Sequence, residues 1–166
     1  MKVGIISDTH GYLDDRIIDY LGDCDQIWHA GDIGSVEVMD RLSPLATSRF
    51  VYGNIDGNAI RIRCPEYQFF MAEGLAVYMI HIGGYPGKYQ PGVRHFIEDH
   101  QPGLFISGHS HILKIMPDHK HNLIHINPGA AGRNGLHKMR TIALIEIEAA
   151  KITDAKVIEL GKRSAL

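Results

Sequence analysis

Short apolar segments alternate with polar loops along the first third of the chain. These segments have the length and composition of buried strands, and they cover residues 2–7, 26–29 and 50–52. Between them, apolar side chains three or four residues apart predict helices over residues 14–21 and 36–42, with Ser35 as the expected N-cap of the second. Strands that alternate with helices in this way favour a parallel sheet.

The pattern changes after residue 66, where strand-forming residues dominate. We expect strands at residues 67–71, 75–80, 104–107, 112–116, 123–126, 141–148 and 157–160. The first two should form a hairpin. One helix is expected over residues 93–100, stopped by Pro102 and Gly103. The prediction is one α/β domain, residues 1–166, whose first sheet is mostly parallel and whose second sheet is mostly antiparallel.

Composition and charge argue against several classes of protein. The 166 residues are 45% hydrophobic, which suits a globular domain with a real core. The formal charge is −2 without a run of Lys or Arg, which argues against binding to a nucleic acid polymer. No apolar run approaches the roughly 18 residues that span a bilayer, and residues 1–7 do not resemble a signal peptide. We therefore expect a cytoplasmic protein without a membrane partner, with Cys24 and Cys64 as reduced thiols.

Residue types that bind metals follow five of the predicted strands directly. In chain order these residues are Asp8 and His10, Asp32, Asn54 and Asp56, His81, and His109 and His111. In open α/β sheets, ligands bind outside the carboxyl ends of the strands, so these side chains should converge on one site. Asp8 and His10, like His109 and His111, are alternate residues. In an extended segment each pair would point the same way, and could bind one metal or straddle two.

The ordered set is more specific than any of its members. Taken alone, Asp32 would be interpreted as a turn former. The chain has eleven histidines, and those outside the set have weaker interpretations. His29 either orients a ligand or bonds to backbone. His119 and His121 are expected to be solvated, and His95 and His100 to be exposed on a helix. His125 and His137 stay unassigned, and Arg133 is interpreted as a surface arginine, with contact to a substrate phosphate as the alternative.

The same residues resemble the five sequence blocks of the calcineurin-like metallophosphoesterases. The blocks read Asp8-Thr9-His10, Gly31-Asp32, Gly53-Asn54-Ile55-Asp56, His81 and Gly108-His109-Ser110-His111. The short chain and its Asn127-Pro128-Gly129 segment are similar to the small bacterial and archaeal phosphodiesterases of that superfamily. The resemblance implies a four-layer αββα sandwich, in which two mixed β-sheets pack face to face with helices outside.

The resemblance also implies how two divalent metal ions would be held. One ion would be bound by Asp8, His10, Asp32 and His111, and the other by Asp32, Asn54, His81 and His109, with Asp32 shared. Carboxylate, amide and imidazole ligands together suit transition metals better than Ca²⁺, which prefers oxygen alone. Mn²⁺ is favoured, with Fe, Zn²⁺, Ni²⁺ or Mg²⁺ as alternatives.

The implied reaction is hydrolysis of a small phosphate ester, with a phosphodiester preferred. Two metals roughly 3.5–4 Å apart can share a water molecule and lower its pKa, so that the resulting hydroxide attacks phosphorus in line. The residues assigned to catalysis are Asp32, Asn54, Asp56 and His109, with Asp56 expected behind the metal ligands. No protein nucleophile is needed.

Three positions depart from the family pattern and leave alternatives open. Ile55 stands where larger nucleases and protein phosphatases carry His, which argues against those activities. Ile82 stands where Gly is frequent, and Ala130 where Ser is common. The alternatives are a non-catalytic interaction scaffold of the same fold, such as a retromer subunit, a phosphomonoesterase, a nuclease, or a metal-handling protein. The complete ligand set favours catalysis, and a homodimer or higher homo-oligomer stays open.

Overall fold

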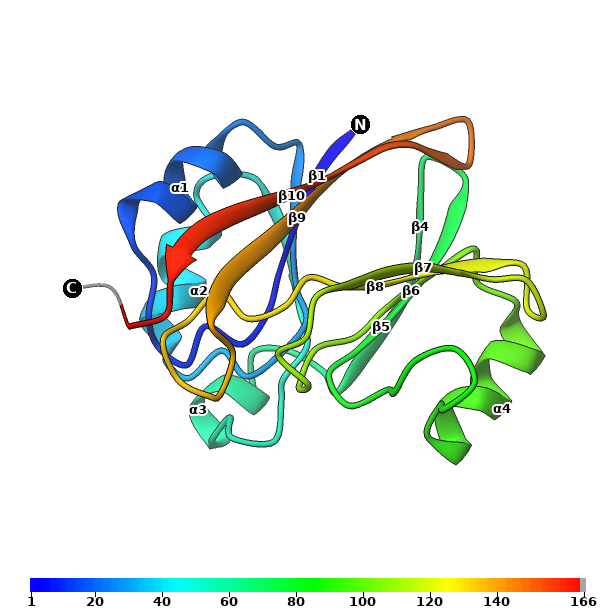
Figure 1. The fold of residues 1–166 in the computed structure, drawn as a ribbon, viewed down its shortest axis with the longest axis horizontal. Helices are drawn as coiled ribbons and strands as arrows, with labels where there is room; N and C mark the ends of the chain where they lie inside the picture. The colour runs from blue at the N-terminus through cyan, green and yellow to red at the C-terminus, as the bar shows by residue number, and fades with distance from the viewer. Residues whose placement is uncertain (165–166) are drawn as a thin grey trace.

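The first of two five-stranded β-sheets contains the first and the last strand of the computed structural model, which describes residues 1–164 (Figure 1). Its strand order is β10-β9-β1-β2-β3. The strands are β1 (Lys2–Ile6), β2 (Gln26–His29), β3 (Thr47–Phe50), β9 (Met139–Glu148) and β10 (Lys151–Lys162). The strands β1, β2 and β3 run parallel, whereas β9 is antiparallel to both β1 and β10.

The second sheet has the strand order β4-β5-β6-β8-β7. Its strands are β4 (Tyr67–Ala72), β5 (Leu75–Ile80), β6 (Leu104–Ile106), β7 (Lys114–Asp118) and β8 (Leu123–Asn127). The central strands β5, β6 and β8 are parallel, and the edge strands β4 and β7 are antiparallel to their neighbours. Each sheet thus has two parallel and two antiparallel pairings, so the expectations of a mostly parallel first sheet and a mostly antiparallel second sheet were both wrong. Helix α4 (Pro91–His100) carries the chain back across the sheet between β5 and β6, which makes these two strands parallel.

Three apolar clusters establish four layers, which confirms the αββα sandwich. Between the sheets, Val3 and Trp28 from the first sheet pack with Val77 and Ile106 from the second. The helices α1 (Asp15–Gly22) and α2 (Val36–Leu42) cover the outer face of the first sheet, and α4 covers the outer face of the second (Figure 1). A short helix that the sequence pattern did not predict, α3 (Asn58–Arg61), follows the third strand. Within residues 1–164, no helix has the length and apolar character needed to cross a membrane.

The largest errors in the predicted boundaries lie in edge strands. The third strand was predicted at residues 50–52 but covers 47–50, and the last was predicted at 157–160 but covers 151–162. An edge strand has one neighbour and a solvated side, so it tolerates polar residues that hide the strand pattern. Ser35 does occupy the N-cap of α2, although its side chain makes no capping hydrogen bond. Cys24 and Cys64 are both free and buried.

Candidate metal centre

The loops that follow β1, β2, β5 and β6 meet at one edge of the sandwich and bring six of the seven predicted ligands together. They form two groups: Asp8 with His10 and His111, and Asp32 with His81 and His109. Within each group the potential ligand atoms lie within 4.8 Å of one another. The seventh, Asn54, is exposed and lines a cleft together with His81.

Asp32 faces both groups. Its Oδ2 lies 3.8 Å from His10 Nε2, and its Oδ1 lies 3.2 Å from His81 Nε2. Oδ1 also accepts a hydrogen bond from the Ile55 N–H at 3.1 Å. Burial alone would raise the pKa of Asp32, but the His81 imidazole and the Ile55 N–H outweigh burial and hold the pKa below its usual value. A charged carboxylate between two ligand groups is the arrangement that a shared ligand requires.

Asp8 is fully buried and has one oxygen free for a cation. Its Oδ2 accepts hydrogen bonds from the Ser7 hydroxyl at 2.6 Å and from the His109 N–H at 3.2 Å. Its Oδ1 has no hydrogen-bond partner among the described residues and lies 3.1 Å from His111 Nε2. Leaving a buried carboxylate oxygen unpaired is costly, so this oxygen marks a position for a cation.

The neighbours of His81 point to the same conclusion. Its Nδ1 lies 2.7 Å from the carbonyl oxygen of Ala30, so Nδ1 donates and Nε2 carries the lone pair in the neutral ring. That buried Nε2 has no hydrogen-bond partner within residues 1–164, and it faces carboxylate oxygens of Asp32 and Asp8 at 3.2 and 4.0 Å. Burial opposes charge on the ring, but the two carboxylates outweigh it and raise the pKa of His81. The lone pair of Nε2 and the two carboxylates together therefore fit a divalent cation.

His137, which sequence reasoning left unassigned, orients His111. The His137 Nε2–H donates to the carbonyl oxygen of Gly132 at 3.1 Å, which leaves its Nδ1 free to accept. The His111 Nδ1 lies 3.3 Å from that atom and donates to it. The Nε2 of His111 then carries its lone pair toward Asp8 and toward His10 Nε2, which is 3.4 Å away. The two histidines are 26 residues apart in the chain, so no local pattern links them. The only sequence signal for the role of His137 was its place in a glycine-rich loop.

Five of the seven predicted ligands have a left-handed backbone conformation. Their φ angles are 54° at Asp8, 49° at His10, 51° at Asp32, 65° at His109 and 57° at His111. Residues other than glycine seldom adopt this conformation, and such backbone strain is concentrated at functional sites. The expectation that each alternate pair is extended and points one way was therefore wrong. The strands end before the ligands, the chain turns sharply, and His109 and His111 enter different groups.

Glycine is required where these loops touch. A Cβ atom at Gly31 would lie 2.6 Å from the His81 ring, and a Cβ atom at Gly53 would collide with the Asp32 carboxylate. The loops also bond to each other, because the Asp8 N–H donates to Gly31 O and the His10 N–H to Asp32 O, both at 3.0 Å. Close backbone approach therefore fixes the ligands before any metal binds.

Asp56 lies behind the ligands, as expected, but its oxygens are already used. One accepts the Gly34 N–H at 2.8 Å, and the other accepts the N–H groups of Ile33 and Gly53 at 3.1 and 2.7 Å. A carboxylate satisfied by three backbone donors does not reach a reacting group. The catalytic assignment of Asp56 is thus corrected to a brace between the second and third ligand loops.

His29 likewise joins two ligand loops from within the core. It is fully buried, its Nδ1 accepts the Gly31 N–H at 3.2 Å, and its Nε2–H donates to the Thr9 hydroxyl at 2.9 Å. Burial lowers the pKa of His29 to about 4. The ring is therefore neutral and orients the loops that carry Asp8 and Asp32.

His125, His121 and Arg133 each have a partner outside the two ligand groups. His125 is buried in β8 and bonds to the Ser107 hydroxyl at 3.0 Å, and burial lowers its pKa to about 4. His121 was expected to be solvated, but it is only partly exposed and bonds to Asp118 at 2.6 Å. The guanidinium of Arg133 lies over the ring of Tyr12 at 4.4 Å.

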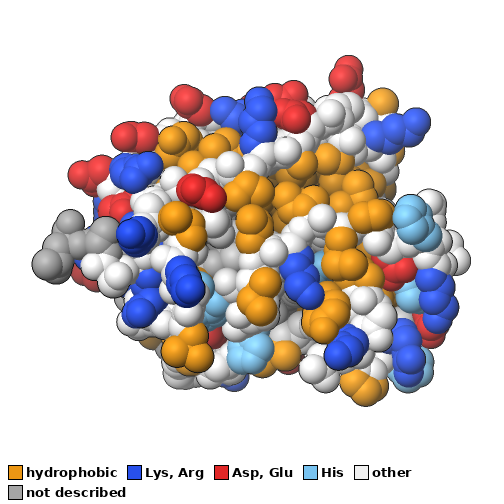
Figure 2. All heavy atoms as spheres, viewed as in Figure 1, with side chains coloured by type: hydrophobic (Ala, Val, Ile, Leu, Met, Phe, Trp, Pro, Cys, Tyr) orange, Lys and Arg blue, Asp and Glu red, His pale blue; other side chains and the backbone are white. Residues whose placement is uncertain are grey.

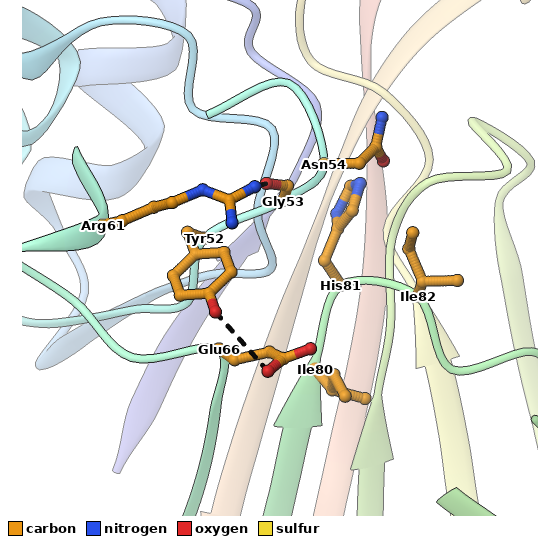
Figure 3. A pocket seen from close by; sticks show the side chains of 8 residues that line it. All are labelled: Tyr52, Gly53, Asn54, Arg61, Glu66, Ile80, His81 and Ile82. Atoms are coloured by element: carbon orange, nitrogen blue, oxygen red, sulfur yellow. Dashed lines mark hydrogen bonds between the residues drawn. The ribbon is translucent and has the colours of Figure 1, made fainter. Parts of the chain in front are cut away.

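A cleft of about 350 Å³ opens beside the second ligand group (Figure 3). It is lined by Tyr52, Gly53, Asn54, Arg61, Glu66, Ile80, His81 and Ile82. Asn54 and His81 lie at one end, so a molecule bound at the metal centre has a path into the cleft (Figure 3).

The sequence of residues 1–150 matches the profile of the calcineurin-like phosphoesterase superfamily domain. The chain belongs to this superfamily. A probable metallophosphoesterase of Methanothermobacter thermautotrophicus is 29% identical over 168 residues, covering 97% of this chain and 94% of that relative. Members of this superfamily are metal-dependent phosphoesterases, which agrees with the two ligand groups.

Solved structures of the superfamily share the fold. An archaeal phosphodiesterase superposes with a TM-score of 0.80 at 24% identity, covering 96% of this chain and 100% of the other. Vps29 from Chaetomium thermophilum superposes with a TM-score of 0.77 at 14% identity, covering 96% and 93%. At these identities the likeness establishes the fold of the superfamily and not a substrate.

Proposed function

We propose that this protein is a dinuclear metal-dependent phosphodiesterase that hydrolyses a small phosphate ester. The observation that carries the proposal is the pair of ligand groups on either side of Asp32, in which lone pairs of buried carboxylate and imidazole atoms face one another. Divalent ions of the manganese, iron or zinc type would polarise the phosphoryl oxygens there and lower the pKa of a water molecule.

The chain's own residues then divide the remaining work. Asp32 is the ligand shared between the groups. Asn54, which lines the cleft with His81, would hold a metal through its amide oxygen, and its amide N–H would donate to a phosphoryl oxygen and neutralise developing charge. His109 is exposed beside His81, with ring centroids 5.3 Å apart, so it can bind metal and face the ester oxygen that leaves. No phosphorylated protein intermediate is required.

The engagement of nearby arginines favours a diester over a monoester. Arg140 donates to Asp14 at 2.8 Å, and its guanidinium lies over the ring of Tyr12. The guanidinium of Arg133 also lies over the Tyr12 ring. Arg61 donates from Nε to the carbonyl oxygen of Asp56 at 2.6 Å. A monoester dianion benefits from extra cationic donors, and of these arginines only Arg61 lines the cleft beside the ligands, where it bonds to backbone carbonyl oxygens. A diester carries a single negative charge and needs less compensation.

The alternative is a scaffold without catalysis, and the similarity to Vps29 supports it at the level of fold. The complete ligand set favours the enzyme. A cytoplasmic location and a homo-oligomeric state stay predictions.

Metal depletion and re-addition test the proposal. The protein is stripped with chelator, and hydrolysis of bis(p-nitrophenyl) phosphate and p-nitrophenyl phosphate is followed after adding Mn²⁺, Fe²⁺, Zn²⁺, Ni²⁺ or Mg²⁺ singly. We expect turnover to return with a transition metal, with the diester preferred. If no metal restores turnover of either ester, the scaffold reading replaces the enzyme.

A further inference from the structure

Three large aliphatic side chains are exposed directly beside the ligands. Ile55, Ile82 and Ile112 have 47%, 39% and 58% of their surface exposed. Each follows a predicted ligand in sequence, namely Asn54, His81 and His111. Single exposed aliphatics are ordinary, but here three of them are chain neighbours of predicted ligands, and Ile82 also lines the cleft. We call Ile55, Ile82 and Ile112 the apolar collar.

The cleft beside the second ligand group continues this apolar surface. Ile80 and Ile82 line one wall, and the ring of Tyr52 lies across from them (Figure 3). Glu66 lies toward the end away from Asn54, where its carboxylate accepts a hydrogen bond from the Tyr52 hydroxyl at 3.4 Å (Figure 3). The cleft therefore runs from the ligands, between apolar walls, to a negative charge.

The positive charge in the cleft is turned toward the protein. Arg61 donates from Nε to the carbonyl oxygen of Asp56 at 2.6 Å and from Nη2 to that of Gly53 at 3.4 Å. Its guanidinium also lies over the Tyr52 ring at 4.4 Å. Arg61 is thus held against the third ligand loop and keeps its charge there, whereas Glu66 brings a negative charge to the end of the cleft away from Asn54 (Figure 3).

We propose, building on the phosphodiesterase function above, that the collar and the cleft bind the alcohol part of the ester and select an uncharged, apolar alkyl or aryl group. A phosphoryl group held by the ligands must direct its ester arms outward across the collar, and one arm can enter the cleft beside Asn54. Each methylene buried there adds up to about fourfold in affinity. A second phosphate or a carboxylate on that arm meets Glu66 and is disfavoured.

Binding of phosphonates, which are not hydrolysed, tests the proposal apart from turnover. Titration calorimetry on the metal-loaded protein compares methylphosphonate with hexylphosphonate. We expect hexylphosphonate to bind at least about tenfold more tightly. The variants Ile82→Ser and Ile55→Ser should each reduce that ratio to below about threefold. Ile62→Ser is the matched control, because Ile62 is 76% exposed and does not line the cleft.

A charged arm tests the role of Glu66. A carboxylate placed at the end of the hexyl chain should weaken binding about tenfold in the unmodified protein, and Glu66→Gln should recover most of that loss. Equal affinity for the methyl and hexyl compounds, or a preference that survives Ile82→Ser, would overturn the proposal.

Turnover of methyl and hexyl p-nitrophenyl phosphate separates this proposal from the proposed function. If both diesters are hydrolysed equally well, the phosphodiesterase stands and the selection of an apolar arm falls. If neither is hydrolysed with any metal, the enzymatic function falls, and with it the substrate class that this proposal assigns.

Discussion

The two sheets contribute different chemistry to the candidate metal centre. The loops of the first sheet supply both carboxylates, and the loops of the second sheet supply imidazoles alone. The first set is Asp8, His10, Asp32 and Asn54, and the second is His81, His109 and His111. The two carboxylates are buried and anchored by backbone N–H groups, whereas His109 is exposed.

Neither sheet provides a complete ligand group by itself. One ligand group joins Asp8 and His10 of the first sheet to His111 of the second, and the other joins Asp32 to His81 and His109. The negative charge that attracts a cation lies on one side, and neutral donors that complete its coordination lie on the other. A metal bound in either group would hold the edges of the two sheets together.

The first prediction removes the shared charge. Asp32→Asn keeps the side-chain shape and the bond from the Ile55 N–H, but it halves the carboxylate charge available to the site. We expect turnover to fall by roughly a thousandfold or more, together with metal content measured by elemental analysis. Asp15→Asn is the matched control, because the Asp15 side chain is 98% exposed. Full activity in Asp32→Asn would contradict the shared-ligand assignment.

The second prediction is that bound metal stabilises the folded protein by bridging the two sheets. Metal at a hundred times its dissociation constant stabilises the folded state by about 2.7 kcal/mol. We expect the thermal midpoint to rise by roughly 5–10 °C over chelated protein. Asp8→Asn removes a ligand from one group and His81→Gln a ligand from the other, so each change should reduce the increase and the double variant should abolish most of it. An increase that survives in the double variant would mean that the metal does not bridge the sheets through these groups.

The third prediction separates the two ligand groups. His137→Phe removes the acceptor for the His111 Nδ1–H, and we expect about ten- to a hundredfold weaker metal binding in the group that contains His111. His137→Gln, which offers an oxygen acceptor, should restore most of the affinity. Calorimetry or Co²⁺ absorption resolves the two binding steps. If both metal-binding steps of His137→Phe keep the wild-type affinity, His137 merely fills space. His95→Gln serves as the control, because His95 is exposed.

The smallest expected effect comes from one buried neutral histidine in each sheet, His29 and His125. Both have a folded-state pKa of about 4, below the unfolded value of about 6.5. The contribution of these neutral rings to the free energy of unfolding is therefore fully present above pH 6.5. It is lost as the pH falls toward 4, because the unfolded chain takes up the protons first. We expect each histidine to lower the free energy of unfolding of the metal-free protein by about 1 kcal/mol between pH 7 and pH 5.5, as measured by urea unfolding.

Glutamine variants of the two histidines test whether the two sheets unfold together when the pH is lowered. His29→Gln and His125→Gln should each reduce the loss between pH 7 and 5.5 by the same amount if the two sheets unfold together. A reduction seen with only one of them would indicate that the sheets unfold separately.

The architecture was predictable because its signals are local or shared with a family. Apolar runs located most strands within two residues, and the family resemblance supplied the four layers. The errors fell where a strand's neighbours decide its conformation. Thr47 to Arg49 form an edge strand in spite of their polarity, and β6 became parallel to β5 through the return of α4. Neither outcome has a local sequence signal.

By itself, the sequence determined which residue types follow each strand, and therefore the chemistry available at one edge of the sheets. That information is local, since a strand end and the ligand after it are adjacent in the chain. Only the tertiary structure decided that His10 and His111, 101 residues apart, share a group, that His137 orients His111, and that Asp56 braces loops. These outcomes depend on contacts between segments distant in sequence, and hydrogen-bond direction and burial are fixed only when those segments pack.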